Sequence, residues 1–214
     1  MTAPTAVEKA WGKARIEALS DGVFAITMTL LVLEIRIPEL PRHAPVGETL
    51  HALATLGPML FSFSITFMLA GAFWYMHHLS FHNTKYVTRP VCAINVLFLM
   101  FVSLLPFSTG LLGRLGLDHP IALAVYFGNQ LVLGVVLNLH WEYARRHGLL
   151  VSPISDPAGR FMIAVQPLGC LLALATIRFA PPLTYYAFVA VVGGSRVYTR
   201  RRFQPLPPNA PAPL

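Results

Sequence analysis

The chain has 214 residues, of which 55% are hydrophobic and only 12% are charged. Its mean hydropathy of +0.60 lies outside the usual range of a soluble globular domain. Sixteen Lys and Arg against nine Asp and Glu give a formal net charge of +7, which in a soluble domain would suggest a nucleic-acid partner. These basic residues flank apolar segments, so membrane topology explains the charge better. The composition therefore predicts a protein embedded in a lipid bilayer, without a nucleic-acid partner.

Six helix-length apolar segments follow one another along the chain, each close to the ~20 residues that cross about 30 Å of hydrocarbon. Turn-forming residues mark the connections between them. Three prolines inside the segments, Pro58, Pro106 and Pro167, should kink the helices or mark where they begin. The sequence thus predicts an all-α fold of six transmembrane helices. We place these helices near residues 18–37, 52–76, 90–112, 120–142, 160–178 and 183–199.

The six-span domain, residues 18–202, is flanked by two short segments. Residues 1–17 are predicted to lie in the cytoplasm. The proline-rich tail, residues 203–214, has too little apolar content to pack and is predicted to be disordered. With the N-terminus inside, twelve of the sixteen basic residues are cytoplasmic, as the positive-inside rule expects. An even number of spans then places both termini in the cytoplasm. The basic residues on the outer side are Arg36, Arg42, Arg114 and Arg178.

The first apolar segment carries ionisable residues at both ends. Ser20 and Asp21 come before its apolar run, and Glu34 follows it. Ionisable groups close to hydrocarbon are costly, so they usually face a protein interior or a watery path and find a partner there. Arg15 is the nearest candidate partner for Asp21. Helix capping is the alternative role for Ser20 and Asp21, because both are favoured N-cap types.

One stripe of this helix has the spacing of a possible constriction. Ile26, Leu30 and Leu33 follow the i, i+4, i+7 pattern, and Thr29 lies beside them. Several copies around an axis would form aliphatic rings, which close a path by dewetting. The Thr29 hydroxyl would bond either a partly dehydrated cation or the carbonyl one turn earlier. Ordinary helix packing is the alternative for the stripe, because an equally apolar face lies opposite, formed by Phe24, Met28, Leu31 and Ile35.

Glu34 and Glu39 lie near the outer end of the first segment, where they would concentrate cations by electrostatic focusing. A solvated helix end in which Glu34 pairs with Arg36 is the alternative. Further along, Gly110, Gly113 and Gly116 are spaced by three residues and are interpreted as a turn. These glycines carry no chemistry.

Three histidines, His77, His78 and His82, are close together after the second segment. Neighbouring imidazoles can share a metal ion. A catalytic metal site would need more ligands at the same membrane depth, however, and the remaining histidines are scattered on both sides. We therefore expect no metal, no cofactor and no enzymatic activity.

The order Arg15, Leu19, Ser20, Asp21, Gly22 resembles the signature of the transmembrane protein 175 potassium channel family: an Arg, three residues, an aromatic or apolar residue, then Ser-Asp-Gly. The resemblance continues through FWYMHH (residues 73–78) and FVSLLPF (residues 101–107), in the family's order. It implies a pore lined by the first helix and narrowest at the stripe of Ile26, Leu30 and Leu33. It also implies a polar network that supports the pore helix at its cytoplasmic end, which we call the brace network: Arg15, Ser20, Asp21, Trp74, His77 and His78.

The chain contains a single copy of Ser-Asp-Gly. One helix cannot enclose an ion path, so several copies must meet on a symmetry axis; resemblance to bacterial family members implies a homotetramer. The expected function is passive, potassium-preferring conduction in the plasma membrane, with the potassium ion as the permeant species. A proton-coupled secondary transporter and a non-conducting membrane scaffold are the alternatives. The uncharged centre of the first segment argues against a carrier.

Overall fold

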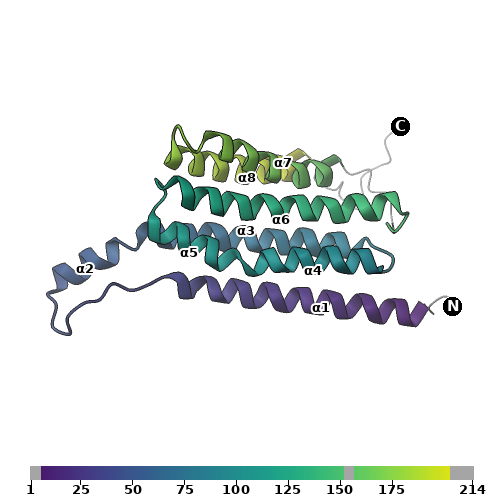
Figure 1. Cartoon of the computed structure of the whole chain (residues 1–214), viewed down its shortest axis with the longest axis horizontal. Coiled ribbons are helices and arrows are strands. Elements are labelled where there is room, and N and C mark those ends of the chain that lie inside the picture. Colours follow the sequence, from purple (N-terminus) through teal and green to yellow (C-terminus); the bar gives the residue numbers. More distant parts are fainter. Residues whose placement is uncertain (1–5, 152–156, 203–214) are drawn as a thin grey trace.

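The computed structural model describes residues 6–151 and 157–202, and the side chains of residues 12–151 and 164–194. The predicted disordered tail, 203–214, lies outside these residues. The described secondary structure is helical, apart from one isolated β-bridge between Thr84 and Leu150. Figure 1 shows the helices running back and forth along one elongated bundle. The prediction of an all-helical fold is confirmed for this part of the chain.

Each of the six predicted ranges overlaps helical residues. Pro58 and Pro106 lie in the first turns of their helices, where a missing N–H costs nothing. Pro167 lies inside a helix. In chain order, the elements are α1 (Ala6–Leu30), the 3-10 helix η1 (Leu31–Glu34), α2 (Val46–Ala54), α3 (Gly57–His82), α4 (Arg89–Ser103), α5 (Leu105–Leu115), α6 (Pro120–Arg146), α7 (Pro157–Thr176) and α8 (Pro181–Arg202).

Four segments within the described residues are long and apolar enough to cross a membrane. The third of them consists of α4 and α5, which are separated at Leu104, two residues before Pro106. A shorter apolar stretch, Ala164–Thr176, belongs to α7. The four segments are Gly12–Glu34, Gly57–His82, Arg89–Leu115 and Pro120–Arg146.

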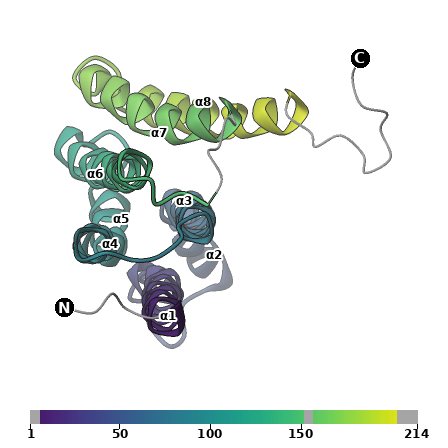
Figure 2. The ribbon, with the colours of Figure 1, turned by 90° about the vertical axis from the view of Figure 1, so that its right-hand side faces the viewer.

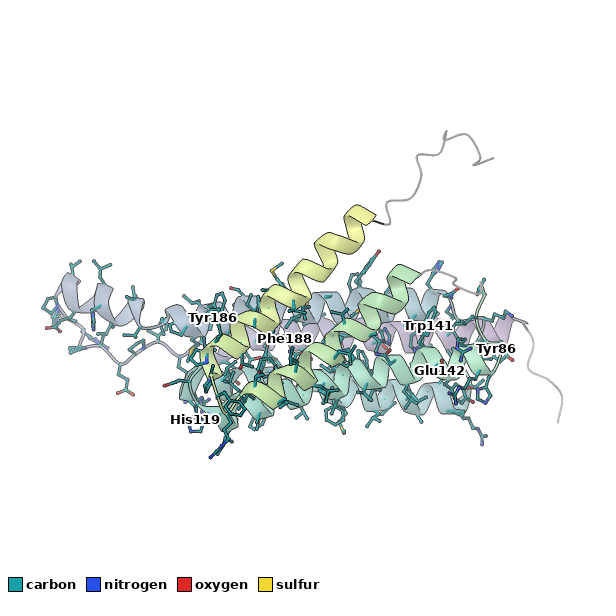
Figure 3. The ribbon with its side chains drawn as sticks, turned by 90° about the horizontal axis from the view of Figure 1, so that it is seen from above. Tyr86, His119, Trp141, Glu142, Tyr186 and Phe188 are labelled. Atoms are coloured by element: carbon teal, nitrogen blue, oxygen red, sulfur yellow. The ribbon has the colours of Figure 1, made fainter. Side chains whose placement is uncertain are left out.

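The helices form layers, with α1 at one edge of the bundle (Figure 2). α1 packs on α3 and α4, and α6 packs on α4, α5 and α7. α7 and α8 pair with each other on the opposite side of the bundle and cross the other helices obliquely (Figure 3). One face of α1 is therefore left without a neighbour from the described residues of its own chain.

The end of the bundle where α3 and α6 terminate is closed by backbone contacts and lysines. Lys13 donates a hydrogen bond of 2.9 Å to the Thr84 carbonyl. Lys85 donates through its side chain to the Gly148 carbonyl at 3.2 Å and through its backbone to Leu149 at 2.7 Å. Carbonyls at helix C-termini lack intrahelical donors and favour cations. These contacts tie α1, the α3–α4 connection and the end of α6 together.

Candidate functional site on the first helix

The two apolar faces of α1, which the sequence leaves equivalent, differ in burial. Phe24 and Leu31 are 1% and 0% exposed, because this face packs into the bundle against Phe73 and Phe98, among others. The opposite stripe faces away from the chain. There, Ile26 is 61% exposed, Leu30 43% and Leu33 70%. Ordinary packing within the chain thus accounts for the face of Phe24 and leaves the stripe of Ile26, Leu30 and Leu33 without a partner.

Thr29 is exposed beside this stripe. Its hydroxyl donates to the carbonyls of Ile26 at 2.8 Å and Ala25 at 3.1 Å. This is the back-bonded geometry common for threonine in helices. A hydroxyl that donates still has oxygen lone pairs that can accept or coordinate, so the Thr29 oxygen stays available on the exposed side.

Ser20 anchors α1 to two neighbouring helices through Asn95 of α4. Ser20 is fully buried, and its hydroxyl donates to the Ile16 carbonyl at 2.9 Å. The Asn95 amide nitrogen donates to the Ser20 hydroxyl at 3.1 Å. The Asn95 oxygen lies 2.7 Å from Nε2 of His77 on α3. The side chains of Ser20, Asn95 and His77 are all buried, where a polar group without a hydrogen-bond partner is costly.

Asp21 makes a separate link to α3. The indole Nε1 of Trp74 donates to Asp21 Oδ1 at 2.8 Å, and a hydrogen bond to a carboxylate is stronger than one between neutral groups. The His78 ring stacks on the Trp74 ring, with centroids 5.9 Å apart and 23° between the planes. The structure therefore places five of the six predicted brace residues in two separate groups of contacts. Ser20 contacts His77 through Asn95, and Asp21 contacts Trp74, on which His78 stacks.

Arg15 does not join this network. It lies six residues before Asp21 on α1, which places the two side chains about 120° apart around the helix. No ion pair between them is present in the described part of the chain, and the Asp21 partner is Trp74 instead. The capping alternative for Ser20 and Asp21 is also wrong, because both lie well inside α1 (Ala6–Leu30).

Glu34 has a different neighbour from the one that the sequence predicted. Glu34 ends η1 and turns toward α5, where its carboxylate lies 3.5 Å from Arg114. The alternative partner Arg36 is therefore wrong. Glu39 is exposed in the connection between η1 and α2. Its place at an outer mouth stays a prediction.

The glycine turn predicted at residues 110–116 is wrong at two of its three positions. Gly110 and Gly113 lie inside α5, and Gly116 ends this helix with φ of +90°. The histidines also separate: His77 is buried inside the bundle, whereas His78 and His82 are exposed. In the described residues, no three His, Cys, Asp or Glu side chains gather as metal ligands do.

Asn95 is the residue of this site that the sequence predictions missed. It stands alone among apolar residues in the run VCAINVLFLM. A lone amide in a membrane helix is costly without a partner and commonly bonds across to another helix. That signal is available in the sequence, although it does not identify the partner.

Comparison with known proteins places this geometry in a family. The family model described as the endosomal/lysosomal potassium channel TMEM175 matches residues 15–106, which include Ser20, Asp21, Trp74, His77 and Asn95. A potassium channel of Streptomyces collinus is 33% identical over 180 residues, covering 81% of this chain and 86% of that protein. The endosomal/lysosomal proton channel TMEM175 of Gallus gallus is 38% identical over 101 residues, covering 45% of this chain and 20% of that protein.

The fold agrees with a solved structure. The crystal structure of a lysosomal potassium-selective channel TMEM175 homolog from Chamaesiphon minutus matches with a TM-score of 0.73 and 30% sequence identity, over 87% of this chain and 97% of that one. Both the sequence and the arrangement of helices agree over most of the chain. The chain therefore belongs to the TMEM175 potassium channel family.

Proposed function

We propose that four copies of this chain assemble with α1 around a central axis and conduct potassium passively. The observation that carries the proposal is the exposed aliphatic stripe of Ile26, Leu30 and Leu33, on a helix whose other face is buried. An exposed apolar stripe in a membrane protein has two possible neighbours, lipid or another copy. The relatives named potassium channels favour another copy, since a single α1 cannot enclose a path. The activity is ion conduction rather than an enzymatic reaction.

Rings of Ile26, Leu30 and Leu33 form the constriction in this assembly. An aliphatic ring offers a cation no replacement for its hydration shell, so a narrow ring dewets and blocks conduction until the helices move apart. Thr29 adds a ring of hydroxyl oxygens next to these side chains. Its lone pairs favour partly dehydrated potassium; the neighbouring hydroxyl residue Thr27 is buried away from this face. Glu39 attracts cations to the outer mouth.

The brace network holds α1 at its cytoplasmic end. Ser20 and Asp21 bind α1 to α4 and α3 through contacts of 3.1 Å and 2.8 Å. Fixed attachment at this end leaves the outer part of α1, with the constriction, as the part whose position can change.

The membrane topology completes the proposal. α7 and α8 act as the fifth and sixth spans of a channel domain covering residues 18–202, and both termini lie in the cytoplasm of a cell whose plasma membrane holds the channel. Lys13 and Lys85 support this orientation, because both bind carbonyls at the same end of the bundle and basic residues are enriched on the cytoplasmic side. Residues 1–17 and 203–214 flank this domain on the cytoplasmic side.

Ion flux into liposomes containing the purified protein tests the proposal. Potassium flux should exceed sodium flux, and Leu30→Ala should change the potassium flux because it widens one ring. Leu139→Ala is the matched control, since Leu139 is 50% exposed on α6, a helix that packs mainly on α4, α5 and α7. Flux that needs an imposed proton gradient would indicate a carrier. Absence of flux in the native chain would indicate a scaffold.

A further inference from the structure

The outer end of the pore helix rests on a glycine of α5. Glu34, the last residue of η1, places its side chain over Gly110, which is buried in the middle of α5. A Cβ atom on Gly110 would lie 2.6 Å from Cδ and 3.0 Å from Cγ of Glu34, closer than carbon atoms approach without displacement. The Glu34 side chain thus occupies the space that the missing side chain of Gly110 leaves open.

A charge pair is one of the two components of this contact. Arg114 lies one turn after Gly110 on α5, and its guanidinium is 3.5 Å from the Glu34 carboxylate. The two side chains are 48% and 28% exposed. Solvent and salt screen such a pair, so it contributes little to the position of η1. The close approach to Gly110 is the other component: glycine leaves room for the Glu34 side chain here, and an added methyl group would displace its partly exposed carboxylate end.

α5 is a fixed support for this contact. The Thr109 hydroxyl donates to Thr66 of α3 at 3.1 Å. The Asn129 amide of α6 donates to the Ser108 hydroxyl at 3.3 Å. These side chains are buried, so α5 is bonded to α3 and α6 through the two residues that directly precede Gly110. A shift of η1 therefore has to occur relative to a helix that stays in place.

We propose that Glu34 is a positioning residue that docks the outer end of the pore helix on Gly110 of α5 and thereby sets the projection of Leu33 and Leu30 toward the pore axis. Leu33 directly precedes Glu34 in the same 3-10 turn, so movement of the Glu34 side chain moves the outermost ring. This inference rests on the proposed function, because it concerns the pore that α1 forms. In this role the Glu34 side chain contacts α5, on the side of the pore helix away from the axis, and does not line the outer mouth.

Four variants in liposomes test the proposal: Gly110→Ala, Glu34→Ala, the double variant, and Gly128→Ala. Gly128 is the matched control, since a Cβ there meets no atom within 4 Å. Gly110→Ala should change potassium flux and the sodium-to-potassium flux ratio several-fold, and Gly128→Ala should change neither. The double variant should behave as Glu34→Ala does, because removing the Glu34 side chain removes the overlap.

Two further readouts separate positioning from general stability. Glu34→Gln keeps the shape and loses the charge, so its flux and flux ratio should stay near those of the native chain. Glu34→Ala introduces no overlap, so it reports on the contact even if Gly110→Ala fails to fold. A Glu34→Ala variant that unfolds at a lower temperature but keeps the native flux ratio would overturn the proposal. So would a Gly110→Ala channel that behaves like Gly128→Ala.

Failure of this inference differs from failure of the proposed function. Native protein that conducts no potassium overturns the channel and this role of Glu34 together. Native protein that conducts, with unchanged flux in Gly110→Ala and Glu34→Ala, overturns the docking role alone.

Discussion

The side-chain oxygen of Asn95 lies 2.7 Å from Nε2 of His77, in a position where both residues are 3% exposed. The nitrogen of the same amide donates to Ser20 at 3.1 Å. One side chain of α4 therefore joins α3 to α1, and both of its polar ends are used. Loss of Asn95 would take this hydrogen-bond partner from the buried Nε2 of His77, whereas the Ser20 hydroxyl would keep its bond to the Ile16 carbonyl.

Asn95→Leu should destabilise the protein and reduce conduction. The leucine fills a similar volume but leaves the Ser20 hydroxyl and the His77 ring without this partner. The unsatisfied Nε2 of the buried His77 costs about 1–3 kcal/mol, and the Ser20 hydroxyl keeps only its bond to the Ile16 carbonyl. Thermal unfolding in detergent and potassium flux in liposomes are the measurements. Val96→Ala is the control, because Val96 is the next residue on α4 and is 54% exposed. Equal unfolding temperatures for the two variants would contradict the network.

Asp21→Ala and Trp74→Phe should each impair assembly or conduction, and together they should do no more than either alone. Both remove the 2.8 Å hydrogen bond between the Trp74 indole and the Asp21 carboxylate. The bond lies at an exposed position, so its loss should cost about 1 kcal/mol, and residues that share one contact give non-additive effects. Gel filtration and flux measure the outcome. Asp21→Asn, which keeps an acceptor oxygen, should be milder. Additive losses would show that the two residues act separately.

Thr29→Val should lower the preference for potassium over sodium without changing the fold. The hydroxyl proton already bonds the Ile26 carbonyl at 2.8 Å, so only the oxygen lone pairs can contact an ion. Valine has the same shape and no oxygen, whereas Thr29→Ser keeps the hydroxyl and serves as the control. Bi-ionic flux ratios in liposomes measure the preference. If the Thr29→Val channel keeps the native potassium-to-sodium flux ratio, the hydroxyl serves only to bond the helix backbone.

The arrangement of α1 shows how far the sequence predictions reach. Hydrophobicity and length are local properties, so they predicted helical residues in all six ranges, and Pro58 and Pro106 mark where helices begin. They did not predict α2 or the division between α4 and α5. The orientation of α1 depends on its neighbours, because Phe24 and Ile26 are equally apolar. Only packing against Phe73 and Phe98 distinguishes them.

The errors in the site have the same origin. The sequence predicts that Glu34 faces the mouth or pairs with Arg36, because Arg36 is only two residues away. Its actual neighbours, Gly110 and Arg114, come from α5 far along the chain. The sequence predicts Gly110 as part of a turn. A glycine that makes room for a distant side chain cannot be told from a turn glycine by its neighbours in sequence. Arg15 is close to Asp21 in sequence, but residues six positions apart point in different directions from a helix.

Gly134→Ala should weaken the attachment of α7 to α6. A Cβ on Gly134 would lie 3.1 Å from Cδ of Gln166 and 3.2 Å from Cδ of Pro167. Gln166 cannot move away freely, because its amide nitrogen donates to the Gln130 carbonyl at 2.8 Å. Overpacking at such a contact costs about 1–3 kcal/mol. Gly128→Ala on the same helix meets open space and should stabilise the helix by roughly 0.5–1 kcal/mol. Unfolding in detergent should therefore shift in opposite directions for the two variants. A shift toward higher stability in both would mean that Gln166 yields and that α7 is not held at Gly134.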